Sequence, residues 1–153
     1  LGVEGGGYQE GLGLLPVRTA FTREKTLCSS AGTTLQLVAP FASLSNLDIA
    51  GYQIHMGQTT LEGGMPFCLL EDAGEDGCVA GTVMGTYLHG LFDSVPFTQA
   101  LVDMLLARKG MSGTRINAQD RAARREQQLD VLADTLRTSL DMDLVYRILE
   151  EGI

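Results

Sequence analysis

The sequence predicts an α/β fold with strands in its first half and helices in its last third. Segments rich in Val, Leu, Ile, Thr and Tyr alternate with turn residues from Leu14 to about Phe92. After Asp93 the apolar residues recur at helical spacing. The stretch "VAGTVMGTYL" at 79–88 has apolar or small residues at both alternating positions, which is typical of a central strand covered on both faces. These three observations indicate a layered α/β protein.

Two segments are predicted as loops. The opening stretch "LGVEGGGYQEGLG", residues 1–13, holds six glycines and is interpreted as a flexible surface loop. It lacks the G-x-G-x-x-G spacing of a dinucleotide site. The stretch "EDAGEDG" at 71–77 is interpreted as an exposed acidic hairpin loop.

The strand "LDIAGYQIHMG" at 47–57 changes its alternation midway. A β-bulge near Ala50–Gly51 would place the apolar residues before and after it on one face. We then expect His55 to point away from Ile54, on the same side as Gln53.

The apolar run at 79–88 ends on His89, which Gly90 follows directly. In open α/β sheets, ligands bind beyond the carboxyl ends of the strands. Glycine lets the backbone turn sharply there, and imidazole can take and return a proton near neutral pH. His89 is therefore a candidate catalytic residue, and a core histidine bonded to backbone groups is the alternative. His55, in mid-strand, is either structural or lines the same cavity as His89.

Three helices are expected after Asp93. Ser94 and Pro96 suit the start of the first helix, and Gly110 suits its end. Asn117 is expected to cap a second helix, and a short third helix is expected over residues 143–150. The apolar stripes of the first two helices are formed by Phe97, Leu101, Met104 and Leu105, and by Leu129, Leu132, Leu136 and Leu140.

Charge and composition exclude two classes of partner. The net charge of −8 argues against nucleic acid, because binding phosphates requires clustered Lys and Arg. No apolar run reaches membrane-spanning length, and no signal peptide is recognisable. We therefore expect a cytoplasmic protein that binds neither nucleic acid nor membrane.

The three cysteines, Cys28, Cys68 and Cys78, are an odd number without metal-ligand spacing. They fit free thiols in a reducing compartment better than a disulfide framework or a metal site. None lies in the strand-to-helix turn, flanked by small residues, that holds a nucleophile elbow. If His89 acts as a base, its nucleophile is not among them.

Four blocks, in order, carry a family resemblance: "VEGGGYQEGLGLLPVRTAFTREKT" at 3–26, "GYQIHMGQT" at 51–59, "DGCVAGTVMGTYLHGLFD" at 76–93 and "LDMDLVYRIL" at 140–149. They closely resemble the C-terminal part of the cobyric acid synthases. These enzymes are similar in organisation to the other class I amidotransferases of the cobalamin pathway.

The resemblance implies that residues 1–153 are the C-terminal portion of a flavodoxin-like glutaminase domain. It implies glutamine as substrate and His89 as partner of a cysteine that lies before residue 1. Ammonia would pass to a synthetase domain, which uses ATP and Mg²⁺ to amidate corrin-ring carboxylates of adenosylcobyrinic a,c-diamide. No cofactor or metal is expected in this part. His55 is assigned to substrate binding.

Position 91 departs from many class I amidotransferases, which have Glu two residues after the histidine. Leu91 stands there, so the resemblance implies a Cys–His dyad or a ring held by another group. Two alternatives stay open: an a,c-diamide synthase or related amidotransferase, and a non-catalytic regulatory or binding module. We also expect this chain alone to be inactive, and to be marginally stable or to associate.

Overall fold

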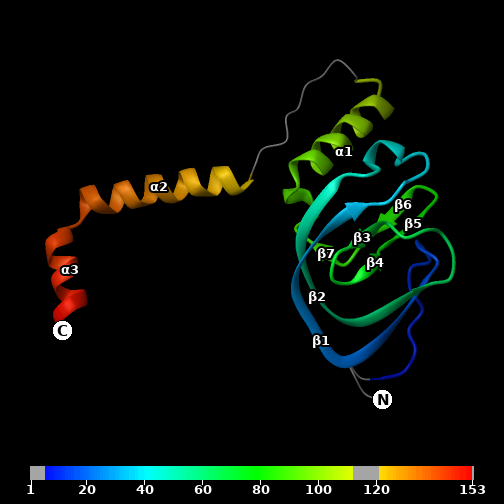
Figure 1. Ribbon diagram of the computed structural model, residues 1–153, viewed down its shortest axis with the longest axis horizontal. Coiled ribbons are helices and arrows are strands. Elements are labelled where there is room, and N and C mark those ends of the chain that lie inside the picture. The colour runs from blue at the N-terminus through cyan, green and yellow to red at the C-terminus, as the bar shows by residue number, and fades with distance from the viewer. Residues whose placement is uncertain (1–5, 112–120, 153) are drawn as a thin grey trace. The chain divides into compact units, whose positions relative to one another are not determined.

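A long antiparallel ribbon forms the framework of the computed structural model, which describes residues 6–111 and 121–152. The ribbon consists of β1 (Val17–Thr34) and β2 (Asp48–Leu61), and it curls on itself (Figure 1). β1 and β2 pair continuously from Thr33 opposite Asp48 to Thr26 opposite His55, and the register shifts only beyond that point. The bulge predicted near Ala50–Gly51 is therefore wrong. Ile49 points inward, while Tyr52 and Ile54 are exposed on the other face.

Shorter strands extend the ribbon into a sheet whose strand order is β4-β3-β1-β2-β7. All its pairings are antiparallel. β3 (Cys68–Leu70) and β4 (Gly74–Asp76) form a hairpin, as predicted, but its loop spans only residues 71–73, because residues 74–76 of the predicted loop are the strand β4. β7 (Leu88–His89) pairs only with β2, so it is an edge strand within the described residues.

The central strand predicted over residues 79–88 is wrong. β5 (Cys78–Ala80) and β6 (Val83–Gly85) instead form a separate hairpin. Gly81 turns the chain between them, with φ +58, a backbone angle that glycine adopts readily. The sequence has apolar residues at both odd and even positions here because both strands of the hairpin face the core: Val79 is part of the core and Met84 packs against it. A mostly antiparallel sheet with three helices results, compatible with an α/β domain.

α1 (Val95–Arg108) and two short 3-10 turns, η2 (Ala42–Leu44) and η3 (Leu91–Asp93), complete the first unit. Phe97 of α1 is buried and meets Phe67 edge-on, with ring centroids 5.9 Å apart. Ser94 precedes the helix, but its hydroxyl donates to the carbonyl of Asp48 instead of capping. Leu105 of the predicted stripe is exposed. The core consists of Leu37, Phe41, Leu44, Ile49, Phe67, Cys68, Leu70, Val79, Leu88, Leu91 and Phe97.

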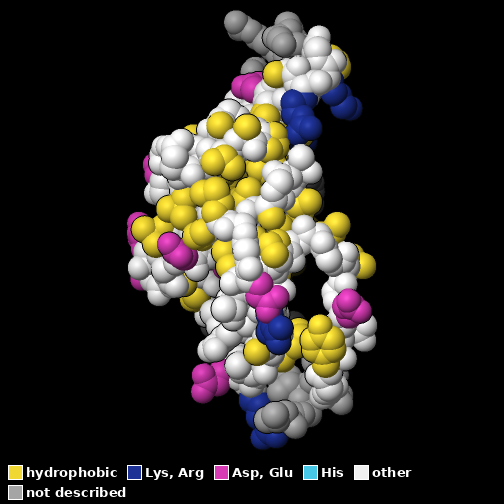
Figure 2. All heavy atoms as spheres, turned by 90° about the vertical axis from the view of Figure 1, so that its right-hand side faces the viewer, with side chains coloured by type: hydrophobic (Ala, Val, Ile, Leu, Met, Phe, Trp, Pro, Cys, Tyr) yellow, Lys and Arg dark blue, Asp and Glu magenta, His cyan; other side chains and the backbone are white. Residues whose placement is uncertain are grey.

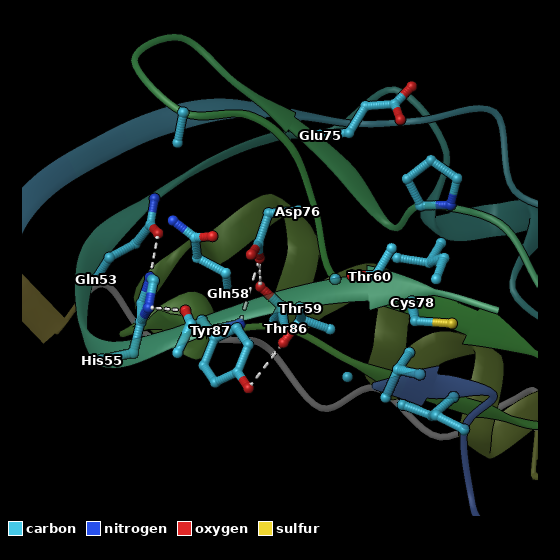
Figure 3. A pocket seen from close by; sticks show the side chains of 18 of the residues that line it. Gln53, His55, Gln58, Thr59, Thr60, Glu75, Asp76, Cys78, Thr86 and Tyr87 are labelled. Atoms are coloured by element: carbon cyan, nitrogen blue, oxygen red, sulfur yellow. Dashed lines mark hydrogen bonds between the residues drawn. The ribbon is translucent and has the colours of Figure 1, made fainter. Parts of the chain in front are cut away.

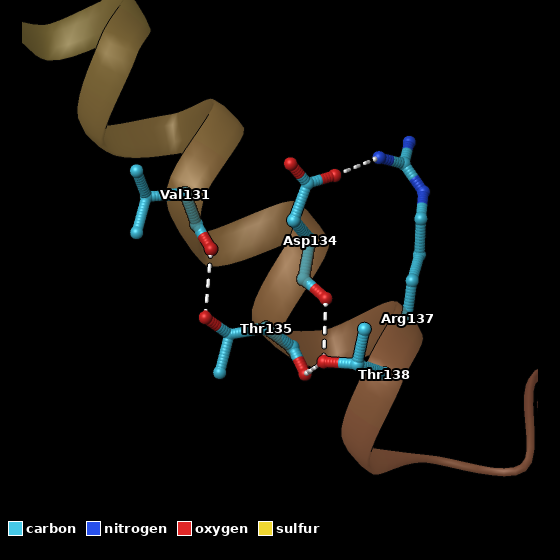
Figure 4. A network of polar contacts seen from close by, with 5 residues as sticks. All are labelled: Val131, Asp134, Thr135, Arg137 and Thr138. Atoms are coloured by element: carbon cyan, nitrogen blue, oxygen red, sulfur yellow. Dashed lines mark hydrogen bonds and ion pairs between the residues drawn. The ribbon is translucent and has the colours of Figure 1, made fainter.

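The chain divides into two units, Leu1–Ala118 and Gln119–Ile153. The second contains α2 (Arg121–Ser139) and α3 (Met142–Glu151), as predicted. Arg137 pairs with Asp134 on α2 at 3.0 Å, and Thr135 and Thr138 donate to carbonyls one turn earlier (Figure 4). Asp141 caps α3 by accepting from the amide of Leu144. The predicted cap Asn117 lies outside the described residues.

None of the helices in the described part of the chain is long and apolar enough to cross a bilayer. Figure 2 shows one face of the molecule, on which hydrophobic side chains gather in a broad patch.

Candidate functional site

His89 lies on β7, directly opposite Tyr52 of β2. The two strands can pair this closely because residue 51 is glycine. A Cβ at Gly51 would stand 2.0 Å from the carbonyl oxygen of His89. Gly90 then leaves the sheet with φ +81, in the left-handed region that glycine favours. The predicted sharp turn after His89 is confirmed.

The imidazole of His89 is exposed and rests on the ring of Tyr52. Their centroids are 5.1 Å apart and their planes differ by 13°, so the rings are stacked. Within the described residues, neither ring nitrogen of His89 has a hydrogen-bond partner. Leu91, at the position where many class I amidotransferases have glutamate, is 6% exposed and belongs to the core. His89 is thus exposed at the end of a strand, though that strand lies at the edge of the sheet.

His55 points to the opposite face of β2. It lies on the same side as Gln53, as predicted, and its Nε2 is 2.9 Å from the Gln53 side-chain oxygen. Its Nδ1 is 2.9 Å from the carbonyl oxygen of Gly57. Gln53 is 3% exposed and donates to the hydroxyl of Ser30. Both nitrogens of His55 are therefore held by protein groups.

A cavity of about 680 Å³ opens beside His55 (Figure 3). Its lining includes Gln53, Thr59, Asp76 and Tyr87 but not His89. The prediction that the two histidines line one cavity is therefore wrong, because they lie on opposite faces of β2. The assignment of His55 to substrate binding stays a prediction.

Tyr87 and Asp76 fix the segment that leads into β7. The ring of Tyr87 lies 4.8 Å from that of His55, and its hydroxyl is 3.1 Å from the Thr59 hydroxyl. The Asp76 carboxylate accepts hydrogen bonds from the Thr86 hydroxyl and the Tyr87 amide. The contacts of Tyr52, Tyr87 and Asp76 around the two histidines were not predicted from the sequence. The available signal was a tyrosine shortly before each histidine, in "GYQIH" and "TYLH".

Residues 2–97 match the model of a protein family, the CobB/CobQ-like glutamine amidotransferase domain. The chain belongs to this amidotransferase family. It is 36% identical to the cobyric acid synthase of Lachnoclostridium phytofermentans, over 99% of this chain and 32% of that protein. It is 41% identical to that of Citrobacter koseri, over 97% of this chain and 31% of the relative. A probable cobyric acid synthase of Methanocella arvoryzae is 37% identical, over 97% of this chain and 29% of the relative. The chain thus spans about a third of the length of the curated relatives it matches.

An amidotransferase of this family needs a nucleophile, and the thiols of this chain are poorly placed for that role. Cys68 and Cys78 are buried, and burial raises the pKa of both thiols. The pKa of Cys68 reaches about 12, with the nearby Asp76 charge as a second cause. A thiol attacks as its thiolate, which a raised pKa disfavours. Cys28 is exposed but lies opposite Gln53, on the face of the ribbon away from His89.

The described residues contain no group of three or more His, Cys, Asp or Glu side chains that could hold a metal ion.

Proposed function

We propose that this chain is the histidine-bearing part of the glutaminase of a cobyric acid synthase. The observation that carries the proposal is the exposed ring of His89 at the end of β7, whose two nitrogens accept or donate no hydrogen bond within the described residues. Membership in the amidotransferase family supports it, as do the relatives that are named cobyric acid synthase.

The chemistry follows from pairing this imidazole with a cysteine outside the chain. His89 accepts the thiol proton, and sulfur bonds to the carbonyl carbon of the glutamine side chain. The imidazolium then protonates the departing nitrogen, so the C–N bond breaks and ammonia leaves. Water attacks the thioester with His89 as base, which releases glutamate and returns the thiol. Positioned proton transfer of this kind contributes on the order of 10²–10⁴ in rate.

The cysteine belongs to a preceding part of the same domain, which completes a flavodoxin-like sheet. Two features support this arrangement. β7 pairs on one side only among the described residues, and an unpaired edge readily accepts another strand. The large apolar side chains of Leu27, Tyr52 and Ile54 are exposed on the face of the sheet that carries the His89 ring, and exposed apolar surface of this kind is what other protein surfaces cover. Residues 1–153 are then the C-terminal portion of this domain.

The released ammonia serves a synthetase domain of the complete protein. There, ATP and Mg²⁺ support amidation of corrin-ring carboxylates, which converts adenosylcobyrinic a,c-diamide to cobyric acid. We place the reaction in the cytoplasm, since free thiols suit a reducing compartment.

The test is His89→Ala in the complete enzyme. We expect glutamine-dependent amidation to fall by about 10²-fold or more, because the proton carrier is lost. Amidation supplied with free ammonia should stay at the wild-type rate. Both rates are measured on the same preparation by product formation.

Arg23→Ala is the control, since Arg23 is an exposed residue of the same sheet, on β1, and does not line the cavity beside His55. It should leave both rates unchanged. Equal loss of the two activities in His89→Ala would assign His89 to folding. An unchanged glutamine-dependent rate would remove the proposed function altogether.

A further inference from the structure

We propose that Tyr52 is the positioning residue of His89 and takes the place of the carboxylate that position 91 lacks. The inference rests on the proposed function, because it assigns Tyr52 a role in that same reaction. Tyr52 acts through the ring of His89 and touches no substrate in this proposal.

Few other contacts among the described residues restrain His89. β7 is two residues long and pairs only with β2 within the described residues. Gly90 follows in a left-handed turn, and no hydrogen bond from the described residues holds the imidazole. The stacked ring of Tyr52 is therefore the side-chain contact that limits rotation of the imidazole.

The geometry of the contact between Tyr52 and His89 suits a positioning role. Directly opposed residues on an antiparallel pair have close Cβ atoms, so a tyrosine opposite His89 reaches its ring without strain. The planes differ by only 13°, so Tyr52 covers one face of the imidazole. Both nitrogens lie at the ring edge and stay open. A carboxylate partner would instead engage one of them.

Tyr52 is itself held in place by strand pairing although its ring is half exposed. The side chain is 48% exposed, although a large aromatic side chain is stabilised by burial. It stays in place because β2 pairs on both sides at this residue, with Ser29 of β1 and with His89 of β7. Tyr52 is therefore fixed on β2, between β1 and β7, and can restrain the side chain of His89 on the edge strand β7.

The experiment compares four variants of the complete enzyme: Tyr52→Phe, Tyr52→Leu, Ile54→Ala and His89→Ala. Tyr52→Phe keeps the flat ring, whereas Tyr52→Leu keeps apolar bulk without it. Ile54→Ala is the matched control, because Ile54 is exposed on the same face of β2 two residues along. We measure kcat and KM for glutamine hydrolysis, the ammonia-driven amidation rate and calorimetric unfolding. Each kcat is normalised to the fraction of protein that unfolds cooperatively.

Tyr52→Leu should lower kcat by about 3- to 10-fold, the scale of one aromatic pair, with KM for glutamine unchanged. Tyr52→Phe and Ile54→Ala should keep the wild-type kcat. Ammonia-driven amidation should be unaffected in all four.

Three results would overturn the inference: a wild-type kcat in Tyr52→Leu, a loss in Tyr52→Phe as large as in Tyr52→Leu, or an equal loss in Ile54→Ala. Full glutamine-dependent activity of His89→Ala would instead remove the proposed function, whatever Tyr52 does. The two failures are therefore distinguishable.

Discussion

Hydrogen-bond partners lie at both ring nitrogens of His55, whereas the ring of His89 is contacted across its face by Tyr52. The first is half-buried, with Gln53 and Gly57 engaging the two nitrogens. The second is exposed and stacked on Tyr52, with no hydrogen bond from the described residues. Both belong to short motifs that contain a tyrosine, yet they lie on opposite faces of one strand pair. Protein groups thus lie at both nitrogens of His55, whereas within the described residues both nitrogens of His89 are available for proton exchange.

Among the variants that test this difference between the two histidines, Gly51→Ala should have the largest effect on activity. The new Cβ would stand 2.0 Å from the His89 carbonyl oxygen, so β7 must move. We expect glutamine-dependent kcat to fall roughly 100-fold, since misplacing a reacting group by about 1 Å has effects of that size. Steady-state kinetics on the complete enzyme measure the loss.

Gly11→Ala is the control for this change, because no atom lies within 4 Å of a Cβ at Gly11. It should behave as wild type. A fully active Gly51→Ala enzyme would show that the close pairing of β2 with β7 is dispensable.

A smaller effect is expected for His55→Ala. Gln53 loses a partner while it stays buried, and Tyr87 loses the ring that it packs against. We expect the free energy of unfolding to fall by about 1–3 kcal/mol. The glutamine-dependent kcat should fall by less than about tenfold, because the missing ring lies on the face away from His89.

Calorimetric unfolding and kinetics on the same samples separate the two effects, with Arg23→Ala as control. If His55→Ala lost activity as severely as His89→Ala without loss of stability, the contrast between the two histidines would be wrong.

The smallest effect is expected for Cys68→Ala. The glutamine-dependent rate should stay within about twofold of wild type, because a thiol whose pKa is raised so far supplies no nucleophile. Alkylation of the complete enzyme between pH 7 and 9, mapped by mass spectrometry, checks the cause. The pKa of Cys68 is about 12, against an ordinary 9.0, so at pH 9 roughly 0.1% of it is thiolate. Cys28 should react far faster. Rapid alkylation of Cys68 in the folded enzyme would contradict this assignment.

The same shift has a consequence for stability. A folded pKa above the unfolded one means that the unfolded chain gives up this proton first as pH rises. The contribution of Cys68 to stability is therefore complete below pH 9.0 and is lost as pH rises toward about 12.

Local features of the fold could be predicted from sequence, while long-range ones could not. The hairpin at 71–77, the turn at Gly90 and the shared side of His55 and Gln53 depend on neighbouring residues only. The prediction of a single strand over residues 79–88 was wrong because an apolar hairpin and a buried strand have the same residue pattern.

For the candidate site as well, local features could be predicted from sequence, whereas long-range contacts could not. Placing His89 beside a turn required only "LHG", and family resemblance supplied its role. That His89 rests on Tyr52 depends on the pairing of β7 with β2, which joins residues 37 positions apart. No periodicity in either segment encodes that partnership.

Stacking on Tyr52 restrains the plane of the His89 ring but does not distinguish the nitrogen atoms of that ring from its carbon atoms. Turning the imidazole by half a revolution about its Cβ–Cγ bond exchanges a nitrogen for a carbon on each side, yet the contact with Tyr52 is the same. An electron-density map of the complete enzyme should therefore be refined with both ring flips of His89, because only a group that binds one of the two nitrogens would distinguish the flips.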